Sequence, residues 1–360
     1  MSRTRGPWQR GGRGTSPAPR PFVSWRGRGR GQQDGHTEIN MNLIASPSRS
    51  SGLEKDGDTL KDSKVQEEYR EFIQGKLEGY LQRFPLSSEP IQSTQRIEVE
   101  QNILIFFRKL REGISSSHRK DDFALEVYET SLVLATLFNT PLQATTTLSY
   151  LLPSLYYASS SASLRQSGRI SITLISLLHH LVAGYPSQTT FHRHLSTIPS
   201  LFLTRGSQAY KWISGLASAL RMNNYVKLEI LTRPSVIHDV TSGSDATHES
   251  PPPSVSSARC SMRHVDPKLA DEATLALVGV LQTKARTRIW LILRTAYREL
   301  WCQPEYDTSQ WLEKTLVLNL RSADETRDPN VGTWLEGREK DGDVRKKEGT
   351  DNRWILVKPK

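Results

Sequence analysis

Residues 65–84 read VQEEYREFIQGKLEGYLQRF, and Pro85 follows them. The apolar side chains of this stretch recur at steps of three and four residues, which places them on one face of an α-helix. Proline lacks the backbone amide that a further helical turn requires, so we expect the helix to end at Phe84. The stretch therefore predicts a helix with one buried face, which needs neighbouring elements to cover it.

The same spacing returns along most of the chain. We predict further helices over residues 97–110, 123–138, 142–157, 170–182, 189–195, 207–220, 225–231, 269–281, 284–300, 308–316 and 331–339. Residues 170–182 are apolar on nearly every side, which indicates a buried helix. Pro153 is expected to kink the helix over residues 142–157 in its last turn.

The end of the chain has a different pattern. Residues 344–347 (VRKK) and 354–357 (WILV) flank a polar turn at 349–352 (GTDN), which is typical of a two-stranded hairpin. Successive amphipathic helices joined by short loops favour a helical-repeat stack, although no fixed-period motif is readable. Three helices followed by a hairpin favour a winged-helix module, a variant of the helix-turn-helix arrangement. The predicted fold is mainly α, a helical-repeat stack followed by a C-terminal winged-helix module.

Composition divides the chain into four parts. Residues 1–63 are rich in Arg and Gly and then polar, with too little apolar surface to offset the entropy of ordering, so we expect a disordered tail and linker. Residues 64–240 hold the predicted stack. Residues 241–266 contain three consecutive prolines and many serines, which indicates a disordered insertion. Residues 267–360 hold the predicted winged-helix part.

The positive charge is concentrated at the N-terminus. The 360-residue chain has 48 Lys and Arg against 38 Asp and Glu, a formal charge of +10. Residues 1–31 contain eight arginines, no lysine and no acid, so the rest of the chain is nearly neutral at +2. Arginine binds phosphate bidentately and stacks on bases, and glycine lets the backbone follow an irregular partner. We predict that the tail binds RNA through Arg3, Arg5, Arg10, Arg13, Arg20, Arg26, Arg28 and Arg30.

The alternative for this tail is a solubilising or targeting segment with incidental affinity for nucleic acid. If all eight arginines contacted phosphates of one single strand, the logarithm of the affinity would fall with the logarithm of the salt concentration with a slope of about −5.6. The salt dependence of binding therefore distinguishes the two interpretations.

The C-terminal hairpin is a second candidate contact with nucleic acid. Its cations are Arg345, Lys346, Lys347, Arg353 and Lys358, and residues 284–298 add five more Lys and Arg. Acidic residues between 336 and 348 dilute this positive charge. The alternative is a solvated hairpin whose Trp354 and Ile355 pack on the helices.

Catalytic and cofactor motifs are missing from the sequence. Two cysteines, Cys260 and Cys302, can form neither a disulfide framework nor a zinc site of four thiolates. There is no phosphate-binding loop of the G-x-x-x-x-G-K-[ST] type and no G-x-S-x-G elbow. No uninterrupted apolar run reaches about 18 residues, the length of a membrane span. We expect an intracellular, non-enzymatic protein with no cofactor, no small-molecule substrate and no membrane contact.

Histidine is the one residue type that suggests a metal site. His179, His180, His192 and His194 are close in sequence, but a metal needs three or four converging ligands, and no acid lies nearby. The sequence favours His179 and His180 at a buried helix end and a solvated pair at His192 and His194. We therefore expect no metal.

Several short stretches resemble the PCI superfamily, and within it the Sac/GANP/Thp group of messenger-RNA export and processing factors. They are residues 107–114 (FRKLREGI), 126–129 (EVYE), 209–213 (AYKWI), 219–225 (ALRMNNY), 284–286 (KAR) and 296–300 (AYREL). The resemblance spans residues 65–360, interrupted by the insertion. After Asn224 and Tyr225 the family tends to place paired aromatics, whereas this chain has Val226, Lys227 and Leu228.

The resemblance implies a helical stack with a winged helix, in a non-enzymatic subunit of a nuclear RNA complex that holds RNA and other protein subunits. We expect a nuclear location, with the cytoplasm as a second one. The alternative within the same fold is a structural subunit of a proteasome-lid, COP-nine signalosome or translation-initiation assembly that does not bind RNA directly.

Overall fold

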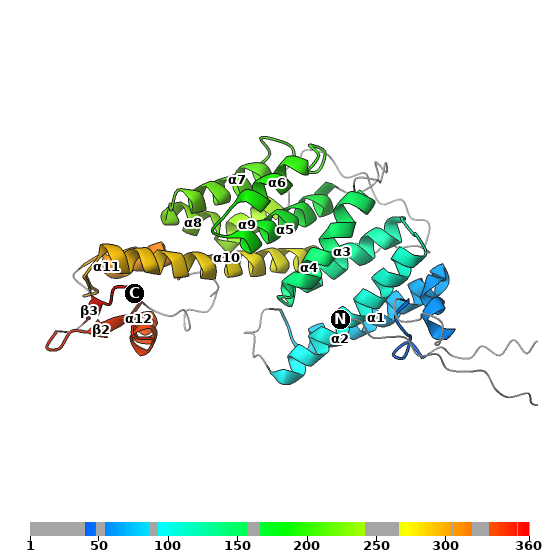
Figure 1. Ribbon diagram of the computed structural model, residues 1–360, viewed down its shortest axis with the longest axis horizontal. Coiled ribbons are helices and arrows are strands. Elements are labelled where there is room, and N and C mark those ends of the chain that lie inside the picture. Colours follow the sequence, from blue (N-terminus) through cyan, green and yellow to red (C-terminus); the bar gives the residue numbers. More distant parts are fainter. Residues whose placement is uncertain are drawn as a thin grey trace, which may run out of the picture. The chain divides into compact units, whose positions relative to one another are not determined.

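The computed structural model describes residues 40–47, 55–86, 93–156, 166–241, 266–303, 306–318, 331–350 and 352–359. Twelve α-helices and three short strands make up these residues, together with a 3₁₀ segment and a π-helical turn. The mainly helical class predicted from the sequence is therefore confirmed (Figure 1).

The first four helices pack in chain order. They are α1 (Ser63–Arg83), α2 (Thr94–Ser116), α3 (Asp122–Leu137) and α4 (Pro141–Tyr150), and each contacts the next. The side chains of Asp62, Ser93 and Asp121 accept hydrogen bonds from backbone amides in the first turns of α1, α2 and α3. Such N-caps fix where the helices begin, because the first amides of a helix have no partner within it.

The predicted apolar face of α1 is buried. Tyr69, Ile73, Leu77 and Tyr80 are at most 2% exposed, as the spacing of residues 65–84 predicts. The helix itself begins at Ser63 and ends one residue before the predicted end, at Arg83, with Phe84 as its C-cap.

The predicted helix over residues 142–157 changes geometry at its proline. Helix α4 ends at Tyr150, and a π-helical turn, η3 (Leu151–Tyr156), follows it. Because Pro153 cannot donate a backbone hydrogen bond, the regular i to i+4 pattern cannot continue through it. The irregularity expected at Pro153 is therefore a wider turn, in which Leu151, Leu155 and Tyr156 remain buried.

Five helices form the middle of the chain. They are α5 (Gln166–Gly184), α6 (Thr189–Thr197), α7 (Gln208–Arg221), α8 (Tyr225–Leu231) and α9 (Pro234–Thr241). Helix α5 contacts α6, α7 and α9, and its residues 171–179 are all buried. The prediction of a buried helix over residues 170–182 is confirmed, and the helix extends beyond both predicted ends.

The two helices predicted at 269–281 and 284–300 are one continuous helix. Helix α10 (Pro267–Ala296) has 30 residues, and nothing in Gln282-Thr283 breaks it because both residues are compatible with helix. Helix α10 lies against α3, α5 and α9 (Figure 1). It ends at Ala296, so the second predicted helix is wrong over residues 297–300.

The chain then forms a small sheet and two more helices. The elements are β1 (Glu299–Trp301), α11 (Thr308–Leu316), α12 (Val331–Lys340), β2 (Val344–Lys346) and β3 (Arg353–Leu356). The sheet is antiparallel in the order β1-β3-β2, with Leu300 opposite Trp354 and Arg345 opposite Ile355. The predicted hairpin is confirmed as β2 and β3, whereas β1 is a strand that the sequence analysis assigned to a helix.

Part of the predicted N-terminal linker belongs to the core. A 3₁₀ segment, η2 (Lys55–Lys61), packs against α1 and α2, and both Leu60 and Ile44 are buried. The Leu60 carbonyl accepts a hydrogen bond from Gln66 Nε2 at 2.8 Å. Two apolar side chains in a polar segment are enough to anchor it, which corrects the expected linker for these residues.

The Arg/Gly tail and residues 242–265 of the predicted insertion lie outside the described residues. Met41–Lys360 cluster as a single compact unit, so the parts that the sequence analysis placed on either side of the insertion share one core. None of the helices in the described ranges has the length and apolar character needed to cross a membrane.

Candidate functional site

The positively charged residues of the hairpin fall into two groups, which differ in whether they pair with a carboxylate. Arg345, Lys346 and Lys358 are exposed, and no ion pair joins them to a described residue. Lys347 and Arg353 both contact the carboxylate of Glu299 on β1, with Arg353 Nε donating to Oε2 at 2.7 Å. The two pairs lower the pKa of Glu299, with the hydrogen bond from Arg353 as the main cause. Two of the five predicted contact residues are therefore compensated within the sheet.

The alternative interpretation, in which Trp354 and Ile355 both pack on the helices, is correct for Trp354 only. Trp354 is 3% exposed and packs into the core, whereas Ile355 is 38% exposed on the outer face of β3. Alternation along a strand puts neighbouring side chains on opposite faces, so only one of the two can be buried. The expectation that Ile355 packs on the helices is wrong.

The cations of α10 mostly hold the fold together. Lys284 Nζ donates to the carbonyl of Val182, and Arg286 donates to the carbonyls of Leu316 and Val317 at the end of α11. Arg294 donates to Val357 O and to the carboxylate of Asp343. These side chains are engaged by backbone carbonyls, whereas Arg288 on α10 and Arg298, which follows the helix, remain exposed.

Asp343 connects α10 with the hairpin. Its carboxylate accepts from Trp290 Nε1 at 2.9 Å and also from Arg294. The Trp290 ring meets Trp334 of α12 edge to face, with 4.7 Å between the centroids. This network fixes β2 and α12 against α10, because each of its polar groups is paired.

The histidines form a structural cluster. The rings of His180 and His194 lie 4.3 Å apart, and His179 Nε2 lies 2.8 Å from Thr145 Oγ1. Burial lowers the pKa of His179 and of His194 to about 4, with His180 adding to the shift. His194 was expected to be solvated, but it is half-buried beside Ser176, which corrects that prediction. The described residues include no group of three His, Cys, Asp or Glu placed to hold a metal.

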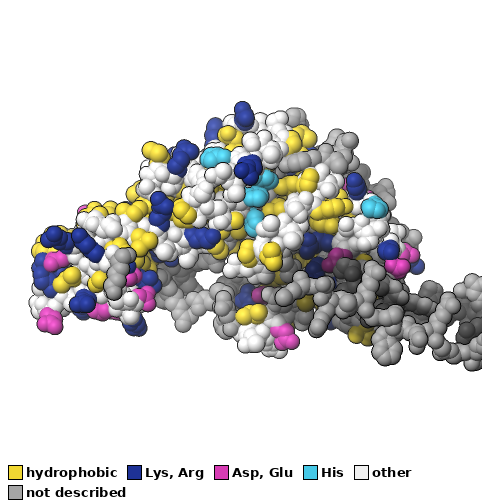
Figure 2. Space-filling view, in the orientation of Figure 1, with side chains coloured by type: hydrophobic (Ala, Val, Ile, Leu, Met, Phe, Trp, Pro, Cys, Tyr) yellow, Lys and Arg dark blue, Asp and Glu magenta, His cyan; other side chains and the backbone are white. Residues whose placement is uncertain are grey.

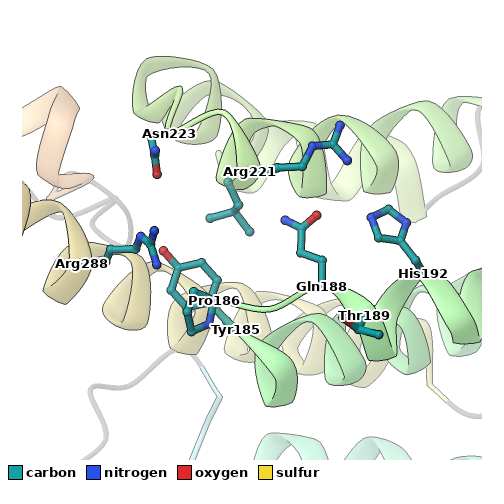
Figure 3. Close-up of a pocket in the computed structure, with 9 residues that line it drawn as sticks. Tyr185, Pro186, Gln188, Thr189, His192, Arg221, Asn223 and Arg288 are labelled. Atoms are coloured by element: carbon teal, nitrogen blue, oxygen red, sulfur yellow. The ribbon is translucent and has the colours of Figure 1, made fainter.

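A pocket that the sequence analysis did not predict lies between α7, α10 and the junction of α5 with α6. Its volume is about 340 Å³, and its wall includes Tyr185, Gln188, Arg221 and Arg288 (Figure 3). The residues come from three separate segments, with Tyr185 and Gln188 after α5, Arg221 at the end of α7 and Arg288 on α10.

Close packing sets the geometry of one wall of this pocket. An added Cβ at Gly184 would lie 2.6 Å from Thr190 Oγ1, so glycine lets the first turn of α6 approach the end of α5. Gln188 Nε2 donates to the carbonyl of Ala217 on α7 at 2.7 Å, which ties the start of α6 to α7. The hydrogen bond to Ala217 holds the Gln188 side chain in a defined position in the wall.

The part of the chain that supplies most of this pocket is strongly basic. Residues 166–241 contain seven Lys and Arg against two Asp and Glu, a net charge of +5, whereas residues 331–359 contain seven against six, a net charge of +1. Five of the seven cations are exposed and make no ion pair with a described residue, and we call them the basic surface: Arg193, Arg205, Lys211, Arg221 and Lys227. A charge count over this segment could have found it.

Figure 2 agrees with the count. Lys and Arg side chains are spread over the part of this face that α6, α7 and α8 form, while Asp and Glu are seen mainly toward the two ends. The eight tail arginines lie outside the described residues, so the structure neither brings them to this surface nor separates them from it.

Exposed aromatic side chains gather at the C-terminal sheet. Among the described residues, the large aromatic rings with substantial exposure are Tyr297, Trp301, Tyr306 and Trp311. They form two edge-to-face pairs, Tyr297 with Trp311 and Trp301 with Tyr306. The Arg353 guanidinium lies 4.1 Å from the centre of the Trp301 ring. This surface is apolar and aromatic, whereas the basic surface is charged.

Comparisons with protein-family models, with curated proteins and with solved structures found no match to this chain.

Proposed function

We propose that this protein is a non-enzymatic scaffold that binds RNA and protein partners. The observation that carries the proposal is the basic surface, in which five exposed cations have no carboxylate partner among the described residues. Unopposed positive charge attracts the phosphate backbone and accelerates encounter with nucleic acid. The Arg/Gly tail would add sequence-tolerant contacts to the same partner.

The proposed architecture is a helical stack followed by a winged helix. The consecutive contacts of α1 to α4 support the stack. For the winged helix, the support is the element order α10-β1-α11-α12-β2-β3 together with the sheet order β1-β3-β2, since a winged helix joins three helices to a small antiparallel sheet.

Helix α12 holds the position from which a helix-turn-helix module usually reads nucleic acid. It carries Glu336 and Glu339 against Arg338 and Lys340, and Arg338 is paired with Asp341 and Asp343. A neutral helix is poorly suited to a phosphate backbone. We therefore assign the C-terminal part to a protein partner, for which the four exposed aromatic rings offer contact area of the kind that binding energy concentrates on.

These assignments agree with a subunit of the Sac/GANP/Thp type in a nuclear complex for messenger-RNA processing or export. A second candidate is a structural PCI-type subunit of a lid, signalosome or initiation assembly without direct contact to RNA. The Glu299 carboxylate pairs with Lys347 and Arg353 and offsets their charge. For the hairpin alone, this pairing favours the second candidate, which does not contact RNA directly.

Fluorescence anisotropy with a labelled single-stranded RNA tests the proposal in the full-length chain. We expect binding that weakens with salt, and a slope that is smaller by about 3.5 when the five cations of the basic surface are replaced by Gln. A second variant, with Gln in place of the eight tail arginines, measures how much the tail contributes to the RNA affinity and to its salt dependence. Absence of RNA binding by the wild-type chain at low salt would overturn the proposal. The structural PCI-type subunit without direct contact to RNA would then be the remaining candidate.

A further inference from the structure

The pocket between α7, α10 and the α5–α6 junction contains two buried polar atoms without a partner. The Tyr185 hydroxyl and the Gln188 Oε1 atom are both buried, and neither has a hydrogen-bond partner among the described residues. Buried polar groups in folded proteins are nearly always paired, and an unpaired one costs about 1–3 kcal/mol. Two such atoms in the wall of one cavity indicate that a ligand supplies their partners.

Of the two atoms, one is a hydrogen-bond donor and the other is an acceptor. Burial raises the pKa of Tyr185, with Arg288 acting in the opposite direction, so the phenol is a hydrogen-bond donor at neutral pH. Gln188 Nε2 already donates to the Ala217 carbonyl, which fixes the amide orientation and leaves Oε1 as an acceptor. The pocket therefore offers one neutral donor and one acceptor.

Two arginines define the charge of the pocket. Arg221 and Arg288 are both exposed in its wall, without an ion pair to any described residue, and the residues that line it include no Asp or Glu. Figure 3 shows the Tyr185 hydroxyl directed toward Arg288, and Arg221 extending on the side of Gln188 and His192. Helix α10 has no acidic residue after Glu272, so it contributes no compensating charge. An anion is the ligand that this set of cations favours.

Size and apolar lining limit the anion further. A cavity of about 340 Å³ is at the lower end of the range for small-molecule sites, far larger than a bare phosphate needs. Leu220, Pro186 and the Tyr185 ring supply apolar surface against which a planar base can pack.

We propose that this pocket binds one nucleotide, with its phosphate held by Arg221 and Arg288 and an amino group of its base donating to Gln188 Oε1. The nucleotide can come from single-stranded RNA, in which case the inference rests on the proposed function, or from a free nucleoside monophosphate. Adenine, cytosine and guanine carry an amino group and uracil does not. We therefore expect the pocket to bind 5′-AMP more tightly than 5′-UMP, whose base can offer only its ring N3–H to Gln188 Oε1.

Isothermal titration calorimetry of the full-length chain with 5′-AMP, adenosine, 5′-UMP and inorganic phosphate tests the pocket. We expect 5′-AMP to bind at least tenfold more tightly than adenosine and than inorganic phosphate, and more tightly than 5′-UMP. Arg221→Gln and Arg288→Gln should each weaken 5′-AMP binding at least fivefold. Lys120→Gln, which removes the same charge from an exposed position outside both the pocket and the basic surface, should change the Kd less than twofold.

Tyr185→Phe separates ligand binding from folding. Because the hydroxyl has no partner in the folded chain, its removal should leave the melting temperature of the free protein unchanged or higher while weakening 5′-AMP binding. A melting temperature that falls with 5′-AMP affinity unchanged would show that the hydroxyl has a structural role and would overturn its assignment.

Competition with single-stranded RNA distinguishes the two sources. RNA that displaces 5′-AMP from the wild type, and binds Arg288→Gln more weakly, supports a nucleotide of RNA as the occupant. Binding of 5′-AMP without competition by RNA supports a free nucleotide as the occupant, and the anisotropy measurement alone then decides the proposed function. RNA binding that is the same in the wild type and in Arg288→Gln, which lies outside the basic surface, together with no 5′-AMP binding, overturns the pocket and leaves the proposed function standing.

Discussion

Arg353 on β3 donates from Nε to Glu299 Oε2 on β1 at 2.7 Å, and its guanidinium also covers the ring of Trp301. The arginine thereby joins two strands of the sheet and shields an exposed aromatic ring. A charge that serves the sheet in this way is less available to a phosphate backbone. The positive residues of the hairpin therefore differ in what they can contribute to binding, although the sequence presents them as one cluster.

This difference predicts how charge reversals in the hairpin act. Arg345→Glu together with Lys346→Glu should weaken RNA binding less than threefold, and should leave the melting temperature unchanged because both side chains are exposed and unpaired with described residues. Arg353→Glu should lower the melting temperature because it places two carboxylates together on the sheet. Anisotropy and thermal melts of both variants check this. A tenfold loss of RNA affinity in the double variant would make the hairpin a principal contact.

A buried ion pair between α1 and α3 predicts a large loss of stability. Arg70 and Glu126 are 4% and 8% exposed in their side chains, with 2.7 Å between Nη2 and Oε1, and Thr130 Oγ1 also donates to Oε1. Arg70→Met leaves a buried carboxylate with one remaining donor, which should cost about 3–5 kcal/mol in the free energy of unfolding.

The double variant Arg70→Met with Glu126→Leu is the control. It removes both charges, so it should be less destabilised than Arg70→Met alone, because no unpaired charge stays buried. Urea unfolding of the wild type, Arg70→Met, Glu126→Leu and the double variant measures the difference. A double variant that loses as much stability as the sum of the single losses would show that the two charges do not act as a pair.

The histidine cluster predicts a loss of stability in acid. The folded-state pKa of His179 is about 4, against 6.5 for an unperturbed histidine, so the unfolded chain binds more protons between these values. Stability contributed by the neutral ring is therefore complete above pH 6.5 and is lost as the pH falls toward 4, by about 3 kcal/mol at most. His179→Gln should flatten this part of the pH profile, and His192→Gln, at an exposed position, should leave it unchanged.

Glu129 has the opposite pH dependence. Burial raises its pKa from 4.5 to about 7, partly offset by the hydrogen bond from Tyr156, so its protonated form is favoured in the folded chain. Its contribution to stability falls as the pH rises from 4.5 through 7. The free energy of unfolding of Glu129→Gln minus that of the wild type should therefore be higher at pH 8 than at pH 5, by about 1–2 kcal/mol, as measured by urea unfolding. An equal difference at both pH values would mean that Glu129 is ionised throughout.

Local patterns predicted the helices well and the site poorly. The buried face of α1 follows from the spacing of Tyr69, Ile73 and Leu77, because a helix sets that spacing by itself. Strand β1 could not be read, because Glu299, Leu300 and Trp301 become a strand only through pairing with β3. The pocket joins residues about 100 positions apart, such as Tyr185 and Arg288, and no local periodicity reports such a contact. Its one signal in the sequence is the excess of positive charge in residues 166–241.

Two glycines on neighbouring helices give a matched test of whether η2 is docked. A Cβ at Gly113 of α2 would lie 2.6 Å from the Leu60 carbonyl oxygen and 2.9 Å from its Cβ, whereas a Cβ at Gly79 of α1 meets nothing within 4 Å. Gly79→Ala should therefore raise the free energy of unfolding by about 0.5–1 kcal/mol through helix propensity alone.

Gly113→Ala has the same gain in propensity but forces η2 away from α2. The displacement breaks the contact of Leu60 and the hydrogen bond from Gln66 Nε2 to the Leu60 carbonyl, so the net effect should be a loss of about 1–3 kcal/mol. Limited proteolysis should also cleave the chain near residues 55–61 faster in this variant than in Gly79→Ala. If both alanine variants were stabilised alike, Leu60 would not pack on α2, and the polar segment before α1 would be the linker that its composition predicts.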